Sequence, residues 1–206
     1  MKFPDKKLLH NAVFAAIICL TFFLGVNVRA QNGTYELKNK NGSYCYISLV
    51  KKGDHVEAEI FAWWNTPSAQ TGSYYGTGSL ISNTVKLRSN ENEPNCKVAL
   101  SWEQKKLHAS FDNCAVDHLP EDFNGLYSKI TDATAGDYTV YAAKTYFHEK
   151  PNAAAKLNSY VVKGNTVNLN LDRIEAGKWV NVYYKNPKGK ETAGYILFTD
   201  LRKLEK

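Results

Sequence analysis

The sequence predicts an all-β protein of two antiparallel units, a barrel or sandwich followed by a small barrel. Three observations support this prediction. After residue 30, apolar residues recur at every second position in short runs, which is the period of a strand with one buried face. Gly, Asn, Pro and Lys separate these runs, as the turns of an antiparallel sheet require. The chain also contains 13 tyrosines and 1 methionine, a composition that favours strands.

The first 30 residues have the three parts of a secretory signal peptide. Three lysines lie near the start, an apolar run follows from 12 to 26, and Val28-Arg29-Ala30 offers small residues where a signal peptidase cuts. An uncleaved membrane anchor is the alternative, but a run of about 15 residues is shorter than the ~20 of a spanning helix. We therefore predict a mature chain that starts at Gln31, has no stable membrane anchor, and is secreted or periplasmic.

Residues 31–130 form the first predicted unit, an antiparallel β domain. In the stretch 55–64, alternate residues are predicted to face the core, namely Val56, Ala58, Ile60, Ala62 and Trp64. The same alternation marks strands near 85–88, 96–102 and 107–111, and hairpin turns are predicted at 51–54 and 103–106. Strands at this spacing predict a barrel or sandwich with hairpin connections.

Two aromatic residues of the same stretch, Phe61 and Trp63, are predicted to lie on its outer face. They share that face with Glu57 and Glu59, and glutamates avoid an unpaired interior. Three interpretations remain open: the rings are covered by the second unit or a loop, form a protein-binding hot spot, or stack on sugar rings. Phe61 and Trp63 are therefore candidate ligand-binding residues.

Three cysteines follow the predicted leader: Cys45, Cys96 and Cys114. An oxidising compartment allows one disulfide and leaves one thiol. Cys96 opens one strand of a predicted hairpin and Cys114 closes the other, so the two residues lie almost opposite each other, at a separation that suits a disulfide. We predict the bridge Cys96–Cys114, and pairing of Cys45 with either residue is the alternative.

The segment 131–137 is small and polar, and the strand pattern restarts after it. We predict a linker here, followed by a second β unit at 138–206 that is small enough to lean on the first. Trp179 and Tyr183 alternate with two valines of one strand, which places them on the face opposite the core. The predicted interior consists of Val161, Val167, Leu169, Val180 and Val182.

The second unit resembles a bacterial SH3-like (SH3b) domain over residues 144–204. The resemblance rests on the order and spacing of four pieces: an aromatic–x–x–x–Pro opening at 147–151, "YVVKG" at 160–164, Trp179-Val180, and a closing Gly194-Tyr195-Ile196 with Asp200-Leu201. The closing aromatic is often Trp in that family and is Tyr195 here, which changes any groove that it lines.

This resemblance implies a small SH3-like barrel that grips an extended ligand with a row of exposed aromatic rings. The candidate ligand-binding residues are Tyr146, Phe147, Trp179, Tyr183 and Tyr195. The resemblance also implies a bacterial cell-envelope protein whose partner is peptidoglycan or an envelope protein. The alternative is that these rings pack against the first unit.

Residues 31–130 resemble the small β-barrel lysozyme inhibitors of the bacterial envelope. The shared features are Gly33-Thr34-Tyr35, a cysteine in the first strand, a glycine-rich middle and a cysteine-closed hairpin. The Ser-Gly-x-x-Tyr pattern of the inhibitory loop is absent from "GSYYGTG" at 72–78. The resemblance to these inhibitors makes an inhibitor of, or an immunity factor against, a cell-wall-degrading enzyme the alternative function.

The sequence contains no Gly-x-Ser-x-Gly, P-loop or His-Glu-x-x-His motif. Cys114 and His118 are too few for a structural zinc site, and Asp117, Glu121 and Asp122 lie in a polar loop. We therefore predict a non-catalytic protein that needs no metal or cofactor. A hydrolase with a cryptic site is the remaining alternative.

The net charge of +6 is uneven along the chain. Residues 31–130 carry 10 basic and 11 acidic residues, hence −1, and residues 131–206 carry 12 basic and 8 acidic residues, hence +4. The basic residues are scattered and form no stripe of the kind that follows a nucleic-acid backbone. We therefore predict no nucleic-acid partner.

Overall fold

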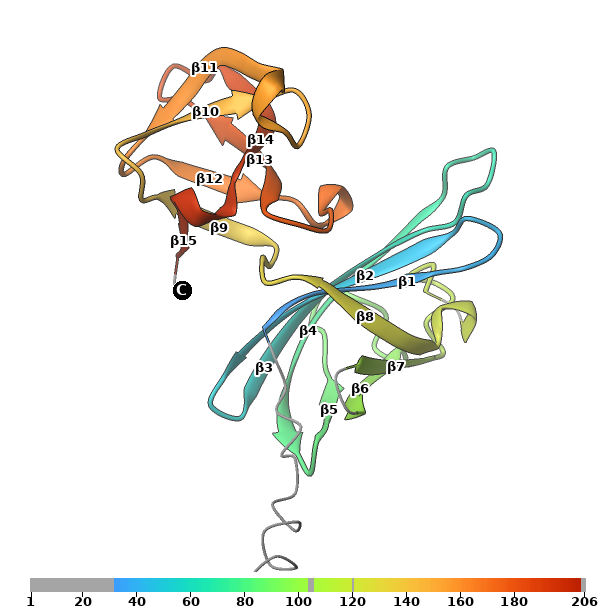
Figure 1. Cartoon of the computed structure of the whole chain (residues 1–206). Coiled ribbons are helices and arrows are strands. Elements are labelled where there is room, and N and C mark those ends of the chain that lie inside the picture. The colour runs from blue at the N-terminus through green and yellow to red at the C-terminus, as the bar shows by residue number, and fades with distance from the viewer. Residues whose placement is uncertain (1–31, 104–105, 120, 205–206) are drawn as a thin grey trace, which may run out of the picture.

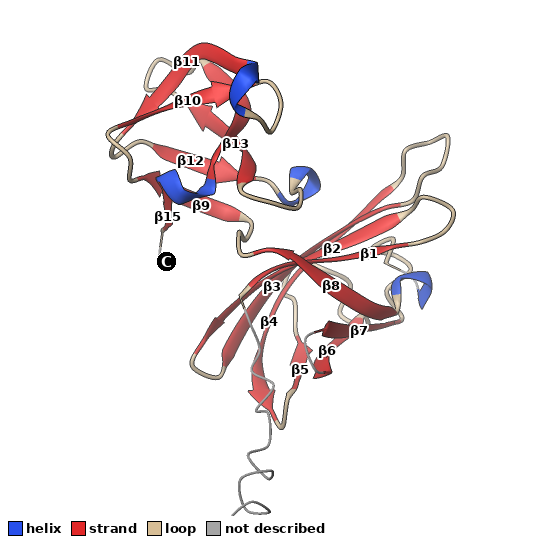
Figure 2. Cartoon of the chain, viewed as in Figure 1, coloured by secondary structure: helices blue, strands red, loops and turns tan. Residues whose placement is uncertain are grey.

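The computed structural model describes residues 32–103, 106–119 and 121–204, so the predicted leader at 1–30 lies outside the described residues. The chain forms two antiparallel β units that follow each other in sequence (Figure 1). Strands dominate, and the helical segments are single 3₁₀ turns (Figure 2). The all-β prediction is thereby confirmed. Within the described ranges, no helix is both long and apolar enough to cross a membrane.

The first unit is a closed barrel of eight antiparallel strands. Its first strand pairs with the second along one side and with the eighth along the other, so closure leaves no strand edge open to pairing. A short 3₁₀ turn, η1 (Glu121–Phe123), precedes the last strand. The strands are β1 (Gly33–Lys38), β2 (Tyr44–Lys52), β3 (His55–Trp63), β4 (Thr71–Ile81), β5 (Thr84–Leu87), β6 (Lys97–Glu103), β7 (Lys106–Asp112) and β8 (Gly125–Thr131).

Strict alternation of inward and outward side chains fills the barrel. Along β3, Val56, Ala58, Ile60 and Ala62 are buried, while the residues between them are partly or fully exposed. The same alternation buries every second residue of β6 and β7, as one buried sheet face requires. The predicted direction of each side chain in the stretch 55–63 is therefore confirmed.

A disulfide joins the ends of the β6–β7 hairpin. Cys96 precedes β6 and Cys114 follows β7, and their Cα atoms lie 4.4 Å apart. The predicted bridge is confirmed. Cys45 lies in β2, is fully buried in the barrel core and remains a free thiol.

The second unit is a seven-stranded antiparallel sheet in the order β11-β10-β14-β13-β12-β9-β15. Its core contains the predicted interior residues Val161, Val167, Leu169, Val180 and Val182, all buried. The strands are β9 (Gly136–Val140), β10 (Lys144–His148), β11 (Lys156–Val162), β12 (Thr166–Leu169), β13 (Trp179–Lys185), β14 (Glu191–Leu197) and β15 (Leu201–Lys203), with 3₁₀ turns η2 (Ala153–Ala155), η3 (Leu171–Arg173) and η4 (Phe198–Asp200).

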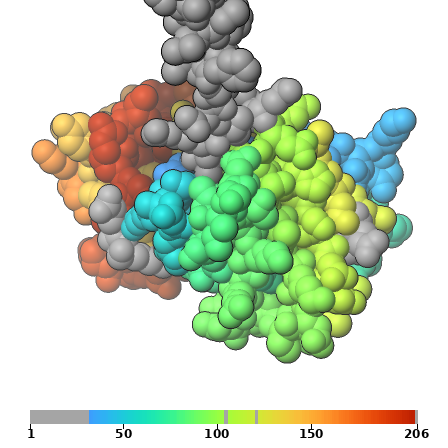
Figure 3. Space-filling view, turned by 90° about the horizontal axis from the view of Figure 1, so that it is seen from below, coloured from blue at the N-terminus to red at the C-terminus, as the bar shows by residue number. Residues whose placement is uncertain are grey.

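The two units are fastened together at the segment 132–135. Thr34 Oγ1 donates a hydrogen bond to the Ala133 carbonyl at 2.7 Å, and Ser48 Oγ accepts one from the Ala135 N–H at 2.8 Å. All four residues are buried, so both bonds are shielded from water. Seen from below, cyan residues of the barrel lie between the green residues that follow them in the chain and the orange and red second unit (Figure 3).

Aromatic residues on the outside of the barrel extend this junction. Tyr46 of β2 is buried in the core cluster of the second unit, and Phe61 of β3 packs against the same cluster, which includes Leu171 and Ile174. The barrel therefore supplies part of the apolar surface that the small second sheet needs.

Candidate functional site: an aromatic track shared by the two units

The outer face of the second sheet gathers aromatic side chains from three adjacent strands. His148 of β10 lies directly opposite Tyr195 of β14, and Tyr195 lies opposite Asn181 of β13. Residues paired in this way point to the same side of a sheet, and so do residues two positions apart along one strand. Tyr146 and Trp179 therefore share this face with His148 and Tyr195.

The ring of His148 packs on the indole of Trp179, with the ring centroids 4.6 Å apart and an interplanar angle of 59°. The Nδ1 atom of His148 lies 3.0 Å from the Asn152 carbonyl oxygen, so the contact favours the tautomer with the proton on Nδ1. The side-chain oxygen of Asn152 in turn accepts from two backbone N–H groups of η2. Asn152 thus orients the His148 ring that packs against Trp179, and the indole remains half-buried.

A groove between the two units continues the aromatic face. Tyr195 and Asn181 form its wall on the second sheet, and Tyr44 and Tyr46 form its wall on the barrel, around a volume of about 540 Å³. The ring of Tyr44 also lies 5.4 Å from that of Trp63, centroid to centroid. We call the combined surface the aromatic track, and it consists of Trp63, Tyr44, Tyr195, His148, Trp179 and Tyr146, while the buried Tyr46 packs against Tyr44.

Polar and charged groups line the same groove. Tyr195 Oη donates a hydrogen bond of 2.5 Å to Glu175 Oε1. Burial, and secondly the Glu175 carboxylate, raise the pKa of Tyr195 to about 12, so the hydroxyl keeps its proton at neutral pH. Lys38 and Arg173 bring positive charge to the rim, and Glu149 and Asp172 bring negative charge. The groove thus offers flat aromatic faces next to hydrogen-bond donors on the basic side chains and acceptors on the carboxylates.

The structure places the sequence-predicted ligand residues in three different environments. Tyr146, Trp179 and Tyr195 meet on the track. Trp63 joins the track through its contact with Tyr44. Tyr183 lies on the outer face of β13 opposite Ala193, four residues after Trp179 and outside the track.

Like Tyr183, two other predicted residues do not belong to the track. The prediction that Phe147 binds a ligand is wrong, because its side chain points inward from β10 and is fully buried in the core, where no ligand reaches it. Phe61 lies on the outer face of the barrel as predicted, but it packs against the core of the second unit. Covering by the second unit is therefore the arrangement that the structure shows for Phe61.

Three aromatic residues of this region were missed by sequence reasoning: Tyr44, Tyr46 and Tyr160. Tyr44 and Tyr46 alternate with the buried Cys45, which is the same period-two signal that identified Phe61 and Trp63. Tyr160 lies opposite Tyr146 in the β10–β11 pair, and only that register relates it to the track.

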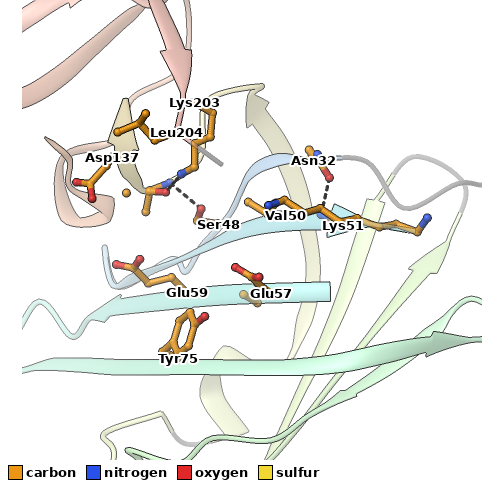
Figure 4. A pocket seen from close by; sticks show the side chains of 14 residues that line it. Asn32, Ser48, Val50, Lys51, Glu57, Glu59, Tyr75, Asp137, Lys203 and Leu204 are labelled. Atoms are coloured by element: carbon orange, nitrogen blue, oxygen red, sulfur yellow. Dashed lines mark hydrogen bonds between the residues drawn. The ribbon is translucent and has the colours of Figure 1, made fainter. Parts of the chain in front are cut away.

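A second hollow lies between the units on the barrel side of the junction (Figure 4). Its volume is about 390 Å³, and Glu57, Glu59, Tyr75 and Asp137 are among its lining residues. Burial first, and then the carboxylates of Glu57, Glu91 and Glu59, raise the pKa of Tyr75. Among the described residues, no group of three or more His, Cys, Asp or Glu side chains is placed to hold a metal ion.

Comparison of the chain with family models, with curated proteins and with solved structures returned no match. Its fold and site define this chain as a disulfide-containing all-β protein, in which a closed barrel carries a second antiparallel sheet with an aromatic outer face.

Proposed function

We propose that this protein is a non-catalytic cell-envelope protein that binds peptidoglycan along the aromatic track. The observation that carries this proposal is the row of rings that runs from Tyr146 through His148, Trp179 and Tyr195 to the barrel. The C–H faces of a sugar ring are apolar and pack on aromatic faces, and its hydroxyls need hydrogen-bonding partners nearby. A row of rings beside Asn181 and the groove carboxylates supplies both to a chain of linked sugars.

The sequence supports an envelope location and a binding role. The leader expected at 1–30 directs a chain out of the cytoplasm, and a disulfide suits an oxidising compartment. The resemblance of residues 144–204 to SH3b domains points to wall attachment. That resemblance also accounts for the small size of the second unit, which such domains share.

Co-sedimentation with purified, insoluble peptidoglycan tests this function. We expect the mature protein to pellet with the polymer and the variant Trp179→Ala to remain largely in the supernatant. The variant Tyr75→Ala is the matched control, because Tyr75 is 43% exposed but lies on the barrel away from the track. Thermal melting must show that both variants remain folded.

A wild-type protein that stays in the supernatant would rule out wall binding. If the two variants pelleted equally, wall binding would not depend on the aromatic track. A pull-down from the native envelope, made in parallel, tests the other partner that the sequence suggests. Recovery of one protein, lost in Trp179→Ala, would replace peptidoglycan by that protein as the ligand of the track.

Inhibition of a wall-degrading enzyme is a second candidate, favoured by the closed barrel with its disulfide-closed hairpin. Glu57, Glu59 and Glu91 surround Tyr75 on this barrel, and such a face complements a basic enzyme. We expect an inhibitor to slow the lysis of cell walls by lysozyme, and Glu57→Gln/Glu59→Gln to weaken that protection. Unchanged lysis in the presence of excess wild-type protein eliminates lysozyme as the target.

A further inference from the structure

A cluster of two tyrosines and two lysines lies where the aromatic track ends on β10 and β11. Tyr146 and Tyr160 are paired across the two strands, with their ring centroids 5.8 Å apart in an edge-to-face arrangement. The Nζ atom of Lys144 lies 3.8 Å from the centroid of Tyr160 and 4.6 Å from that of Tyr146. The Nζ atom of Lys156 lies 3.6 Å from the centroid of Tyr146.

Two ammonium groups therefore share one tyrosine ring. The negative face of an aromatic ring attracts each cation, but two like charges this close repel each other unless an anion lies near. Within the described ranges, the ion pairs of the second unit involve Arg173 and Lys185, and neither Lys144 nor Lys156 takes part in one. The cluster thus presents two positive charges without a carboxylate of the described chain to balance them.

Both lysines are held in place although they are on the surface. The hydrogen bond between Lys144 and Tyr146 raises the pKa of the lysine and lowers that of the tyrosine, so Lys144 carries its full charge at neutral pH. The rings restrict where each ammonium group can lie, and fixed charges lose less conformational entropy when they bind an anion.

The cluster is open to a ligand. β11 is the last strand of its sheet and pairs only with β10, and Tyr160 is 50% exposed. Tyr146 also lies two residues before His148 on the same strand and on the same face. Because Lys156 lies opposite His148 in the β10–β11 pair, a polymer that stacks on His148 and Trp179 passes close to the two lysines.

We propose that Lys144 and Lys156, supported by Tyr146 and Tyr160, form a carboxylate subsite at the end of the track. This subsite takes the acidic groups of the peptides that branch from the glycan, while the track takes the sugars. The inference rests on the proposed function, because it assumes that peptidoglycan is the polymer on the track. A phosphate-rich wall polymer would satisfy the same charges, so its binding must be measured beside that of the peptides.

The test measures the affinity of the mature protein for three soluble ligands by calorimetry. The ligands are glycan fragments with their peptides, the same fragments after an amidase has removed the peptides, and a glycerol-phosphate polymer. The variants are Lys144→Gln/Lys156→Gln and, as a control, Lys163→Gln. Lys163 is a good control because it lies on the same unit, 5.8 Å from the ring centroid of Tyr141, outside the cluster.

We expect the double variant to bind peptide-bearing fragments about tenfold more weakly, because two exposed charge contacts are lost. It should bind peptide-free fragments as wild type does. Lys163→Gln should match wild type on both. Equal wild-type affinity for the two kinds of fragment overturns the subsite but leaves the proposed function intact. The absence of binding to either fragment overturns both. Preference for the phosphate polymer, lost in the double variant, overturns the assignment to carboxylates.

Discussion

The rings of His148 and Trp179 meet 4.6 Å apart although β14 separates their strands in the sheet. The contact therefore bridges three strands and stiffens the middle of the aromatic track. Trp179 alone is a partly exposed indole, and His148 covers one side of it. A ring held in this way can stack on a ligand without first being ordered, which is an advantage in binding free energy.

We expect His148→Ala to loosen Trp179 without unfolding the sheet. Acrylamide should quench the indole more strongly in the variant, and binding to peptidoglycan should weaken several-fold. Because the chain has 4 tryptophans, subtraction of the emission of Trp179→Phe isolates the relevant signal. His55→Ala, on an exposed barrel position, is the control. Identical quenching in His148→Ala and wild type would show that the contact does not hold the indole.

The disulfide Cys96–Cys114 closes a loop with a sequence separation of 18 residues. Cross-linking a loop of this length restricts the unfolded chain and stabilises the fold by about 3 kcal/mol. The double variant Cys96→Ala/Cys114→Ala should lose about that much free energy of unfolding in urea, and its denaturant dependence should rise because its unfolded chain is less compact. Reduction of the wild-type protein should give the same loss. A loss below about 1 kcal/mol would mean that the hairpin register alone fixes this end of the barrel.

Alternation along single strands was sufficient to predict which faces of β3 and β13 are buried, because each strand has only apolar residues on one side and includes charged or amide side chains on the other. In β2, alternation separates Tyr44 and Tyr46 from Cys45 and Ile47, but both sets are apolar, so alternation alone does not say which set faces the barrel core. Tyr46 is buried against the second unit, which is a long-range contact without a local signal.

Two further features show the same limit. Barrel closure pairs Thr34 with Thr131, residues at opposite ends of the unit, and no short stretch of sequence encodes that pairing. Phe147 was assigned to a ligand face from its place in a family pattern, yet it alternates with partly exposed neighbours and points inward. The period of its own strand was the better guide at this position.

Phe61 couples the two units, because it belongs to the barrel but packs against the core of the second sheet. Phe61→Ala removes a partly buried ring from this junction and should cost about 2 kcal/mol. Trp63→Ala is the matched control, since Trp63 lies next to Phe61 on the same face but is not among the described residues that pack against the core of the second sheet. We expect calorimetry to resolve two unfolding transitions in Phe61→Ala and one in Trp63→Ala. Two transitions in wild type as well would show that the units already unfold separately.

Cys45 should be chemically silent in the folded protein. Burial in the barrel core raises the pKa of this thiol from 9.0 to about 12, so the reactive thiolate is absent at ordinary pH. A disulfide reagent at pH 8 should label one thiol per mature chain in denaturant and none in buffer. Rapid labelling of the native protein would show that the core opens locally.

The same shift makes the fold sensitive to alkali. The pKa of Cys45 is higher in the folded than in the unfolded chain, so its contribution to stability is complete below pH 9 and is lost as the pH rises toward 12. Across this window the free energy of unfolding of wild type should fall by up to about 1.4 kcal/mol per pH unit more than that of Cys45→Ala. The comparison concerns the slopes, because the variant also loses packing. Parallel pH profiles would contradict the shift.

Gly72 allows the loop that follows the disulfide to lie directly against β4. A Cβ atom at this position would come within 2.3 Å of the His118 carbonyl oxygen and 2.7 Å of the Asp117 carbonyl oxygen, both of them backbone atoms. The His118 carbonyl also accepts a hydrogen bond of 2.9 Å from Trp64 Nε1, so the loop cannot retreat without breaking that bond. Gly72→Ala should therefore destabilise the barrel by about 2 kcal/mol.

Ser73→Ala, at the exposed neighbouring position, should change the free energy of unfolding by less than about 0.5 kcal/mol. Urea unfolding followed by tryptophan emission measures both variants on the same scale. Because Trp64 would lose its hydrogen bond as the loop moves, the native emission of Gly72→Ala should also shift toward longer wavelength. Equal stability of the two variants would show that the loop gives way freely, and would remove the close approach at Gly72 as a constraint on the fold.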